Sequence, residues 1–273
     1  MGGNAMPSYI CTTCGVGYAE TGAPRETCLI CADERQYVNA RGQGWTTLEE
    51  LRDGHVNEVR QCEPGLTGIG ARPQIAIGQR ALFIERPDGG VLWDCTPLVS
   101  DAALEAIAAK GGVSAIAISH PHFYATMIDW SRALGGVPIY LHEDNRDWVM
   151  RPDPAIEFWS GASKAVADGI TLIRTGGHFP GSTVLHWAEG AGGKGALLTG
   201  DSIMVVPDTR WVSFMYSFPN LIPLNARSVE AIVKSVRAYQ FDRIYAGWWD
   251  RVLDHDAKAA VQRSAERYIA AIR

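Results

Sequence analysis

From residue 74 onward, short runs of apolar residues alternate with segments in which apolar residues recur every three or four positions. The short runs predict buried strands, and the periodic segments predict amphipathic helices. The predicted strands cover residues 75–77, 81–84, 91–94, 113–118, 137–141, 169–174, 183–187, 195–198 and 241–246. The predicted helices cover residues 100–111, 124–134, 225–239 and 256–273. Hairpin strands followed by strands that alternate with helices predict an α/β domain built from two helix-covered sheets.

The segment before residue 74 is less regular. Residues 45–51 predict the start of a helix, with Thr46 or Thr47 as its N-cap. Residues 65–73 are rich in Gly and Pro and therefore predict a loop. We expect residues 39–73 to connect a small N-terminal unit to a main domain of residues 74–273 and to pack against that domain.

The composition is that of an ordinary globular protein. The chain has 273 residues, of which 47% are hydrophobic and 20% charged, so it can bury a large core. The formal net charge of -5 gives no electrostatic reason to expect a nucleic acid or an anionic membrane as a partner. No apolar run approaches about 18 residues, and residues 1–8 lack the basic and apolar segments of a secretory signal. We therefore expect a cytoplasmic protein.

Four of the six cysteines form two Cys-x-x-Cys pairs near the N-terminus, Cys11 with Cys14 and Cys28 with Cys31. Two such pairs can offer four thiolates to one tetrahedral metal ion, and the pattern suits a reducing compartment better than a disulfide framework. A unit of about 30 residues cannot build its own core, so a metal has to hold it. We expect residues 1–38 to form a four-cysteine metal ribbon. Zinc is the default metal, and iron is the alternative because Tyr-x-Cys-x-x-Cys-Gly at residues 9–15 resembles a rubredoxin knuckle.

Candidate ligands for a second metal site follow the predicted strands. His120 and His122 come directly after the strand of residues 113–118, His178 lies in a glycine-rich turn, and Asp201 follows the strand of residues 195–198. A lone histidine is more often a structural residue than a ligand. Four such residues, each just past an apolar strand, indicate a site for a divalent transition metal, because imidazoles and a carboxylate suit zinc in particular.

Three motifs in this order resemble the metallo-β-lactamase superfamily. The motifs are His120-Pro121-His122, Gly176-Gly177-His178-Phe179-Pro180-Gly181-Ser182 and Thr199-Gly200-Asp201. The resemblance covers residues 74–273 and implies a four-layer αββα sandwich with a metal site at one edge, between the sheets. It also implies that His120, His122 and His178 bind the family's first metal, and that Asp201 is the carboxylate that bridges two metals.

The sequence departs from the family pattern His-x-His-x-Asp-His at two positions, where Tyr124 and Ala125 replace the Asp and the last His. The family's final histidine is also missing, because residues 246–249 read Ala-Gly-Trp-Trp. The ligands of the second metal are therefore lost, apart from Asp201, and we expect a mononuclear site. His142 and His255 are alternative ligands, although a structural or surface role is the more common one for each.

This site predicts a metal-dependent hydrolase that uses one zinc ion to cleave an ester, thioester or amide-like bond of a small molecule. Asp201 would complete the coordination or act as general base. Tyr124 would donate a proton or a hydrogen bond to an oxyanion, or it would only fill the vacated pocket. Zinc is expected at both the histidine site and the four-cysteine site, with iron as the alternative at either.

Two other functions stay open on the sequence alone. One is a non-catalytic member of the fold that keeps its metal for stability or for ligand binding. The other is a redox protein, because flavodiiron proteins share this fold and can carry rubredoxin-type domains. Tyr124, Ala125 and the lack of a flavin-binding domain in the sequence argue against redox chemistry. The aromatic segment of residues 211–223 would wall an apolar pocket, form a buried connection, or let the protein form a homo-oligomer.

Overall fold

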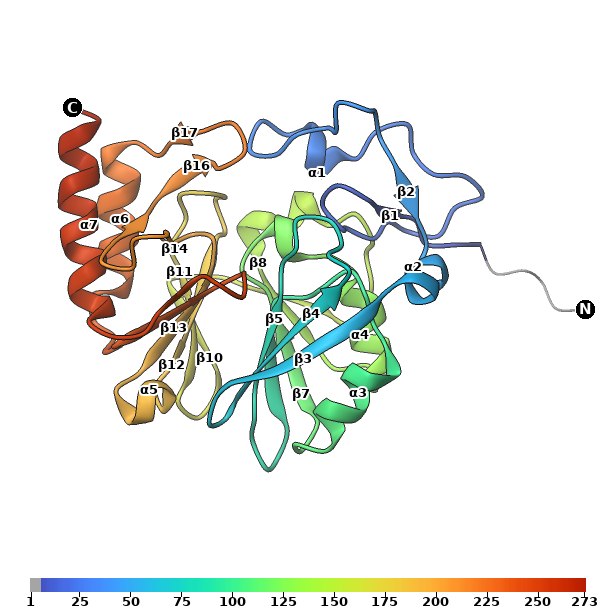
Figure 1. The fold of residues 1–273 in the computed structure, drawn as a ribbon, viewed down its shortest axis with the longest axis horizontal. Coiled ribbons are helices and arrows are strands. Elements are labelled where there is room, and N and C mark those ends of the chain that lie inside the picture. Colours follow the sequence, from blue (N-terminus) through green and yellow to red (C-terminus); the bar gives the residue numbers. More distant parts are fainter. Residues whose placement is uncertain (1–5) are drawn as a thin grey trace, which may run out of the picture.

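The computed structural model describes residues 6–273, and it places two β-sheets face to face at the centre of the molecule (Figure 1). In spatial order, the seven strands of the first sheet are β3 (Val56–Glu63), β4 (Leu66–Arg72), β5 (Ala81–Ile84), β6 (Gly90–Trp93), β7 (Val113–Ala117), β8 (Ile139–His142) and β9 (Ile156–Trp159). Strands β3 to β6 pair antiparallel, and β6 to β9 pair parallel. The start of the predicted ribbon, and most of the segment on which we predicted no secretory signal, lie outside the described residues.

The second sheet has six strands. In spatial order they are β10 (Ser163–Ala167), β11 (Ile170–Arg174), β12 (Thr183–Trp187), β13 (Ala196–Gly200), β18 (Arg243–Ala246) and β19 (Val252–Leu253). Only the β13–β18 pair is parallel. Two small hairpins follow β13, namely β14 (Met204–Val205) with β15 (Val212–Ser213), and β16 (Met215–Ser217) with β17 (Ile222–Pro223).

Helices cover the outer face of each sheet (Figure 1). Helices α3 (Asp101–Ala108) and α4 (Met127–Ala133) pack on the first sheet, and α6 (Ala226–Val236) and α7 (Ala257–Ala271) pack on the second. Alternate residues of a strand point to opposite faces, so Leu82 of β5 enters the core between the sheets while Phe83 contacts the helix side. This layering confirms the predicted αββα sandwich.

The remaining helices are short. They are α1 (Leu29–Ala32), α2 (Leu48–Gly54), α5 (Gly190–Gly193) and the 3-10 turns η1 (Pro121–Phe123) and η2 (Glu143–Trp148). The side chain of Thr47 caps α2, and Glu50 completes the capping box by bonding back to the Thr47 backbone. Thr47 is therefore the N-cap, and the alternative, Thr46, lies in a strand.

The N-terminal ribbon lies across one end of the sandwich, beside the β16–β17 hairpin (Figure 1). Its strand β1 (Ile10–Cys11) pairs antiparallel with β2 (Trp45–Thr46), and α1 lies between them. The ribbon of the structure therefore comprises residues 6–46, which extend past the predicted boundary at residue 38. Backbone hydrogen bonds fix it to the main domain, with the Gly17 nitrogen donating to the Ala125 oxygen and the Ala19 nitrogen to the Met150 oxygen. The ribbon therefore packs directly against the loop that follows His122.

Several sequence-based predictions before residue 100 are wrong. Residues 65–73, predicted as a loop, contain β4, and its glycines have a packing role: a Cβ on Gly68 or Gly70 would lie 2.7 Å from the Trp249 ring. Residues 75–77, predicted as a strand, form a turn in which the Gly78 nitrogen donates to the Ile75 oxygen. Strand β3 was not predicted, and later in the chain neither were β9 and β10.

The helix predicted for residues 124–134 begins later, at Met127, because η1 and an irregular step precede it. Ala125 in that step has a φ of 44°, which an α-helix cannot contain. Among residues 6–273, every helix is too short or too polar to cross a lipid bilayer.

Candidate metal centre

Four side chains from distant parts of the chain meet at one end of the sandwich. His120 and His122 lie just beyond β7, His178 lies in the β11–β12 loop, and Asp201 directly follows β13. One candidate ligand atom from each side chain lies within 4.8 Å of those of the other three. All four residues are buried, with exposures between 0% and 5%. The structure thus brings together the whole set of ligands that the sequence predicted.

The atoms that face one another are imidazole nitrogens and a carboxylate oxygen, which can donate lone pairs to a metal ion. His178 Nε2 lies 3.2 Å from His122 Nδ1, and His120 Nε2 lies 3.1 Å from Asp201 Oδ1. The 3.1 Å approach of His120 Nε2 to Asp201 Oδ1 is not a hydrogen bond, and within residues 6–273 neither of these buried atoms has a hydrogen-bond partner. Buried polar atoms without partners require an explanation, and a metal ion between three imidazoles and a carboxylate provides one. The residues therefore fit a tetrahedral zinc-type site.

Contacts on the outer side of two imidazoles fix their orientation. His178 Nδ1 lies 3.2 Å from the backbone oxygen of Met215, and His120 Nδ1 lies 3.0 Å from Ser119 Oγ. A carbonyl can only accept a hydrogen bond, so Nδ1 of His178 carries the proton and Nε2 presents its lone pair to the centre. Such outer partners orient metal ligands and raise their basicity.

Asp94 is a supporting residue that the sequence-based prediction missed. Its Oδ1 accepts a hydrogen bond from the Ser119 nitrogen at 2.8 Å, directly before His120. Burial raises the pKa of Asp94 to about 8, although the hydrogen bonds from Ser119 oppose the shift. Asp94 directly follows β6, which pairs in parallel with β7. The carboxyl ends of parallel strands meet at one sheet edge, and this rule could have identified the residue.

Gly200 allows Asp201 to reach the centre. Its φ of +56° lies in the left-handed region, and a Cβ there would lie 2.7 Å from Ser119 Oγ. Any other residue would therefore strain the backbone and displace the serine that contacts His120. The Thr-Gly-Asp motif thus has a steric basis in this chain.

The electrostatics of the cluster favour the unprotonated form of two of its imidazoles, those of His120 and His122. Burial lowers the pKa of His120 and His122 well below the usual value, and neighbouring His178 lowers both further. The Arg35 guanidinium also lowers the pKa of His122. Burial raises the pKa of Asp201, and His178 opposes that shift. Neutral imidazoles at neutral pH are the form that binds a divalent metal.

Aromatic rings enclose the imidazoles. The Phe179 ring centroid lies 5.6 Å from that of His120, 5.0 Å from that of His122 and 5.1 Å from that of His178. The Phe218 ring, from the aromatic segment of residues 211–223, lies 6.4 Å from that of His178. The same segment also buries Phe214 in the core beneath α6 and α7. It therefore both borders the centre and forms a buried connection.

Tyr124 lies two positions after His122 in the chain. Tyr124 is buried, and its hydroxyl lies 3.5 Å from the backbone oxygen of Asn145. Burial raises the pKa of Tyr124 above its usual range. In the histidine-free segment of residues 246–249, Trp248 donates from Nε1 to the Ile77 oxygen at 2.8 Å and packs against Phe123. The Phe123 ring in turn contacts His120, so Trp248 is one ring removed from the cluster.

Two other histidines, His142 and His186, have contacts away from the cluster. His142 Nε2 lies 3.1 Å from the Gly161 oxygen, and His186 Nε2 lies 2.7 Å from the Gln240 oxygen. His255 is exposed, near the start of α7. None of the three belongs to the metal-ligand group found among residues 6–273. The alternative ligands considered from the sequence, His142 and His255, therefore do not join the cluster.

The four ribbon cysteines form a second buried cluster. Cys11 Sγ lies 3.6 Å from Cys31 Sγ, and Cys14 Sγ lies 3.7 Å from Cys28 Sγ. These separations are far too long for disulfides, but a tetrahedron with metal–sulfur bonds of about 2.3 Å has edges of about 3.8 Å. Hydrogen bonds from the neighbouring thiols lower the pKa of Cys11, whereas burial raises the pKa of Cys14. The geometry fits a structural metal site.

Two polar side chains support the thiols. Tyr18 donates from its hydroxyl to Cys28 Sγ at 3.3 Å, and Gln43 donates from Nε2 to Cys11 Sγ at 3.2 Å. The Gln43 Oε1 atom also accepts a hydrogen bond from the Cys28 nitrogen. Donors aimed at sulfur stabilise the negative thiolate form, which is the form that binds a metal.

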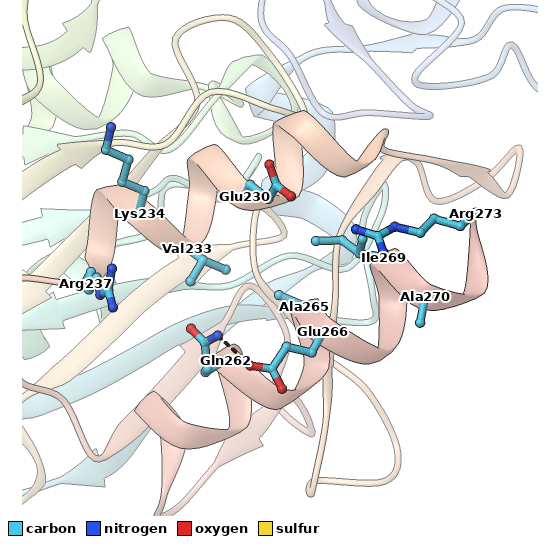
Figure 2. Close-up of a pocket in the computed structure, with 10 residues that line it drawn as sticks. All are labelled: Glu230, Val233, Lys234, Arg237, Gln262, Ala265, Glu266, Ile269, Ala270 and Arg273. Atoms are coloured by element: carbon cyan, nitrogen blue, oxygen red, sulfur yellow. Dashed lines mark hydrogen bonds between the residues drawn. The ribbon is translucent and has the colours of Figure 1, made fainter.

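A separate surface groove of about 520 Å³ lies between α6 and α7 (Figure 2). Its lining includes Lys234 and Glu230 from α6 and Gln262 and Glu266 from α7, and the last two are joined by a hydrogen bond. The groove contains no histidine or cysteine. It therefore offers no metal-ligand set, and the histidine cluster is the better candidate for chemistry.

Comparison with known proteins finds a full-length relative. The uncharacterized protein YmaE of Bacillus subtilis (strain 168) is 49% identical over 269 residues, which cover 98% of this chain and 97% of YmaE. No protein-family model matches the chain.

Solved structures agree with the architecture. VMB-1 matches with a TM-score of 0.60 and 14% identity, covering 80% of this chain and 98% of its own. The metallo-β-lactamase FIM-1 from Pseudomonas aeruginosa, in its mono-zinc form, matches with a TM-score of 0.58 and 15% identity, covering 80% and 97%. The metallo-β-lactamase DIM-1 matches with a TM-score of 0.58 and 12% identity, covering 79% and 98%. At such identities the likeness shows a shared fold.

Proposed function

The chain belongs to the family that includes the uncharacterized protein YmaE of Bacillus subtilis and has the metallo-β-lactamase fold, and from this premise we propose that it is a metal-dependent hydrolase. The proposed centre holds one zinc ion on His120, His122, His178 and Asp201. A second zinc ion on the four ribbon cysteines serves structure, with iron as the alternative at either site. The ester, thioester or amide-like bond of a small molecule is the proposed target.

The observation that carries this proposal is the convergence of four buried ligand atoms within 4.8 Å, two of them without hydrogen-bond partners. Three imidazoles and one carboxylate from three loops converge here, and a metal ion between them would satisfy the buried atoms that lack partners. Tyr124, Ala125 and the histidine-free segment of residues 246–249 stand where the family pattern has further ligands, which supports a single metal.

The metal would supply Lewis acidity and would lower the pKa of water into the neutral range. Asp201 is positioned to take a proton at Oδ1, because burial already raises the pKa of that carboxyl. His120 and His178 flank Asp201, with Nε2 atoms 3.1 and 3.7 Å from Oδ1. Phe179 and Phe218 exclude water from one side of the centre, and they favour a substrate with an apolar group.

The proposed role of Tyr124 is proton or hydrogen-bond donation to a developing oxyanion. Its location next to the His120–His122 turn supports this role, and its hydroxyl is held only by a 3.5 Å contact to the Asn145 oxygen. Rotation about the C–O bond can move the hydroxyl proton from this long contact to a better acceptor at little cost.

A second candidate function is metal-dependent ligand binding without catalysis. The burial of all four ligands favours it, because a hydrolase needs an opening through which a substrate reaches the metal. The four free thiols of the ribbon suit a reducing compartment such as the cytoplasm for either function.

The experiment combines metal analysis with hydrolysis of an ester, thioester and lactam panel by the full chain. We expect two metal ions per chain, hydrolysis of at least one substrate, and a fall in kcat of at least about 100-fold in Asp201→Asn. Asp208→Asn is the matched control, because Asp208 is an exposed carboxylate paired with Arg210. A fully loaded protein that hydrolyses nothing in the panel would favour the ligand-binding function.

A further inference from the structure

The four-cysteine ribbon has no part in the proposed chemistry, yet it reaches the metal centre through one residue, Arg35. Arg35 follows Cys31 by four positions. Its Nε donates to the backbone oxygen of His178 at 2.7 Å. A charge-assisted hydrogen bond of this length is among the stronger contacts that a backbone carbonyl makes. The ribbon thus holds the backbone of a proposed ligand.

The Arg35 side chain is itself held in place. Its Nη1 binds both carboxylate oxygens of Asp33, at 2.8 and 2.9 Å. Its guanidinium carbon lies 4.6 Å from the Phe179 ring centre and 4.5 Å from that of Tyr216. A planar guanidinium between two rings is a preorganised arrangement that lysine cannot reproduce. Arg35 therefore bridges the ribbon, the His178 loop and the β16 strand.

The backbone around Arg35 is tied to the hairpin that orients the His178 ring. Ser217 donates from Oγ to the Arg35 oxygen at 3.1 Å, and Asn220 donates from Nδ2 to the oxygens of Glu34 and Gln36. In the same hairpin, the Met215 oxygen accepts the hydrogen bond from His178 Nδ1. Both contacts that position His178, one on its backbone and one on its ring, therefore depend on where the ribbon docks.

We propose that Arg35 is a positioning residue through which the four-cysteine ribbon sets the metal affinity of the histidine cluster. A ribbon held by its own metal keeps Arg35 on the His178 loop, and the histidine cluster then binds its metal more tightly. Because coupling between two binding sites is reciprocal, metal in the histidine cluster must raise the affinity of the ribbon by the same factor. This inference rests on the proposed metal centre, and it gives the ribbon a function in that centre.

The test is a Co²⁺ titration of the metal-free full chain, which needs no substrate. Co²⁺ on four thiolates gives intense sulfur-to-metal charge-transfer absorption, whereas Co²⁺ on imidazoles and a carboxylate gives weak bands, so one titration follows both sites. We expect Arg35→Gln and Arg35→Lys each to weaken Co²⁺ binding at the histidine cluster by roughly 10- to 100-fold, the range for lost supporting contacts. Arg41→Gln is the control within the ribbon, because Arg41 is exposed.

Unchanged affinity of the histidine cluster in Arg35→Gln would overturn the inference while leaving the proposed function intact. A wild-type chain that binds Co²⁺ only at the thiolates would overturn both. If the Arg35 variants fail to fold, the variant Cys28→Ser/Cys31→Ser gives an independent test. Its histidine cluster must bind Co²⁺ more weakly than that of the wild type, and equal affinity would refute the coupling.

Discussion

The two donor clusters are equally buried, but the chain assembles them in different ways. The cysteine cluster draws all its ligands from a segment in which Cys11 and Cys31 are 20 positions apart. The histidine cluster draws its ligands from loops after β7, β11 and β13, and the contact between His122 and His178 spans 56 positions. The first cluster organises a ribbon that has little core of its own, whereas the second is carried by a sandwich that has a large one.

If each cluster binds its proposed metal, this difference predicts which part of the molecule depends on which metal. A small unit with few core residues folds around its metal, and metal removal unfolds it. A site placed at the edge of a large core loses its ligand but keeps its scaffold. We therefore expect substitutions in the ribbon cluster to unfold more of the chain than substitutions in the histidine cluster.

Loss of the ribbon thiols should have the largest effect. In Cys28→Ser/Cys31→Ser we expect loss of one metal per chain and loss of hydrogen-exchange protection across residues 6–46, because structural zinc contributes an apparent binding free energy of roughly 10–16 kcal/mol. Strands β11 to β13 should keep their protection. Cys62→Ser is the control, since Cys62 lies outside the cluster. A ribbon that stayed protected without metal would contradict the contrast.

Loss of one imidazole should empty the other cluster without unfolding it. In His178→Ala we expect loss of the second metal and of any hydrolysis, while the ribbon keeps its own metal. In the presence of a chelator, the variant and the wild type should melt at similar temperatures, because binding no longer stabilises either. His186→Ala, which lies outside the cluster, should keep both metals. Retention of two metals by His178→Ala would show that His178 is not a ligand.

Removal of the Ser119 hydroxyl should have an intermediate effect. Ser119→Ala takes away the 3.0 Å contact to His120 Nδ1, and we expect roughly 10- to 100-fold weaker metal binding at the histidine cluster. Competition with a chromophoric chelator measures the change. Ser114→Ala, which removes a surface hydroxyl, is the control. An unchanged affinity would mean that Phe123 and Phe179 alone hold the His120 ring.

Removal of the Tyr124 hydroxyl should change stability least. Tyr124→Phe loses one long hydrogen bond to a carbonyl, so the free energy of unfolding should fall by no more than about 1 kcal/mol, and metal content should not change. Chemical denaturation and metal analysis check these points. If the proposed catalytic role is correct, kcat should still fall while KM stays similar. A kcat equal to that of the wild type would leave Tyr124 a packing residue.

The sequence was sufficient for features with a local pattern. The two Cys-x-x-Cys pairs have the same spacing. His120, His122, His178 and Asp201 each follow a recognisable apolar strand. Helix α6 begins where its cap predicted, since Asn225 accepts from the Ser228 nitrogen and the helix starts at Ala226. Such signals lie within a few residues of the feature that they predict.

Features that depend on distant partners could not be predicted. Gly68 and Gly70 suggest a loop until Trp249 is seen to pack against them across the sandwich. Ile75 looks like a strand residue but packs with Leu51 and Leu98 beneath the ribbon. The role of Arg35 depends on a contact that spans 143 positions. No window of sequence contains both partners of such contacts.

The separation between Arg35 and His178 also sets an order of events during synthesis. The N-terminal ribbon leaves the ribosome with its four thiols complete, long before His178 and Met215 have been made. In the proposed two-metal scheme, the thiolates can therefore bind their metal while the sandwich does not yet exist. The imidazoles come together only after both sheets have formed and the ribbon has docked. We therefore expect the thiolates to be filled first and the imidazoles last.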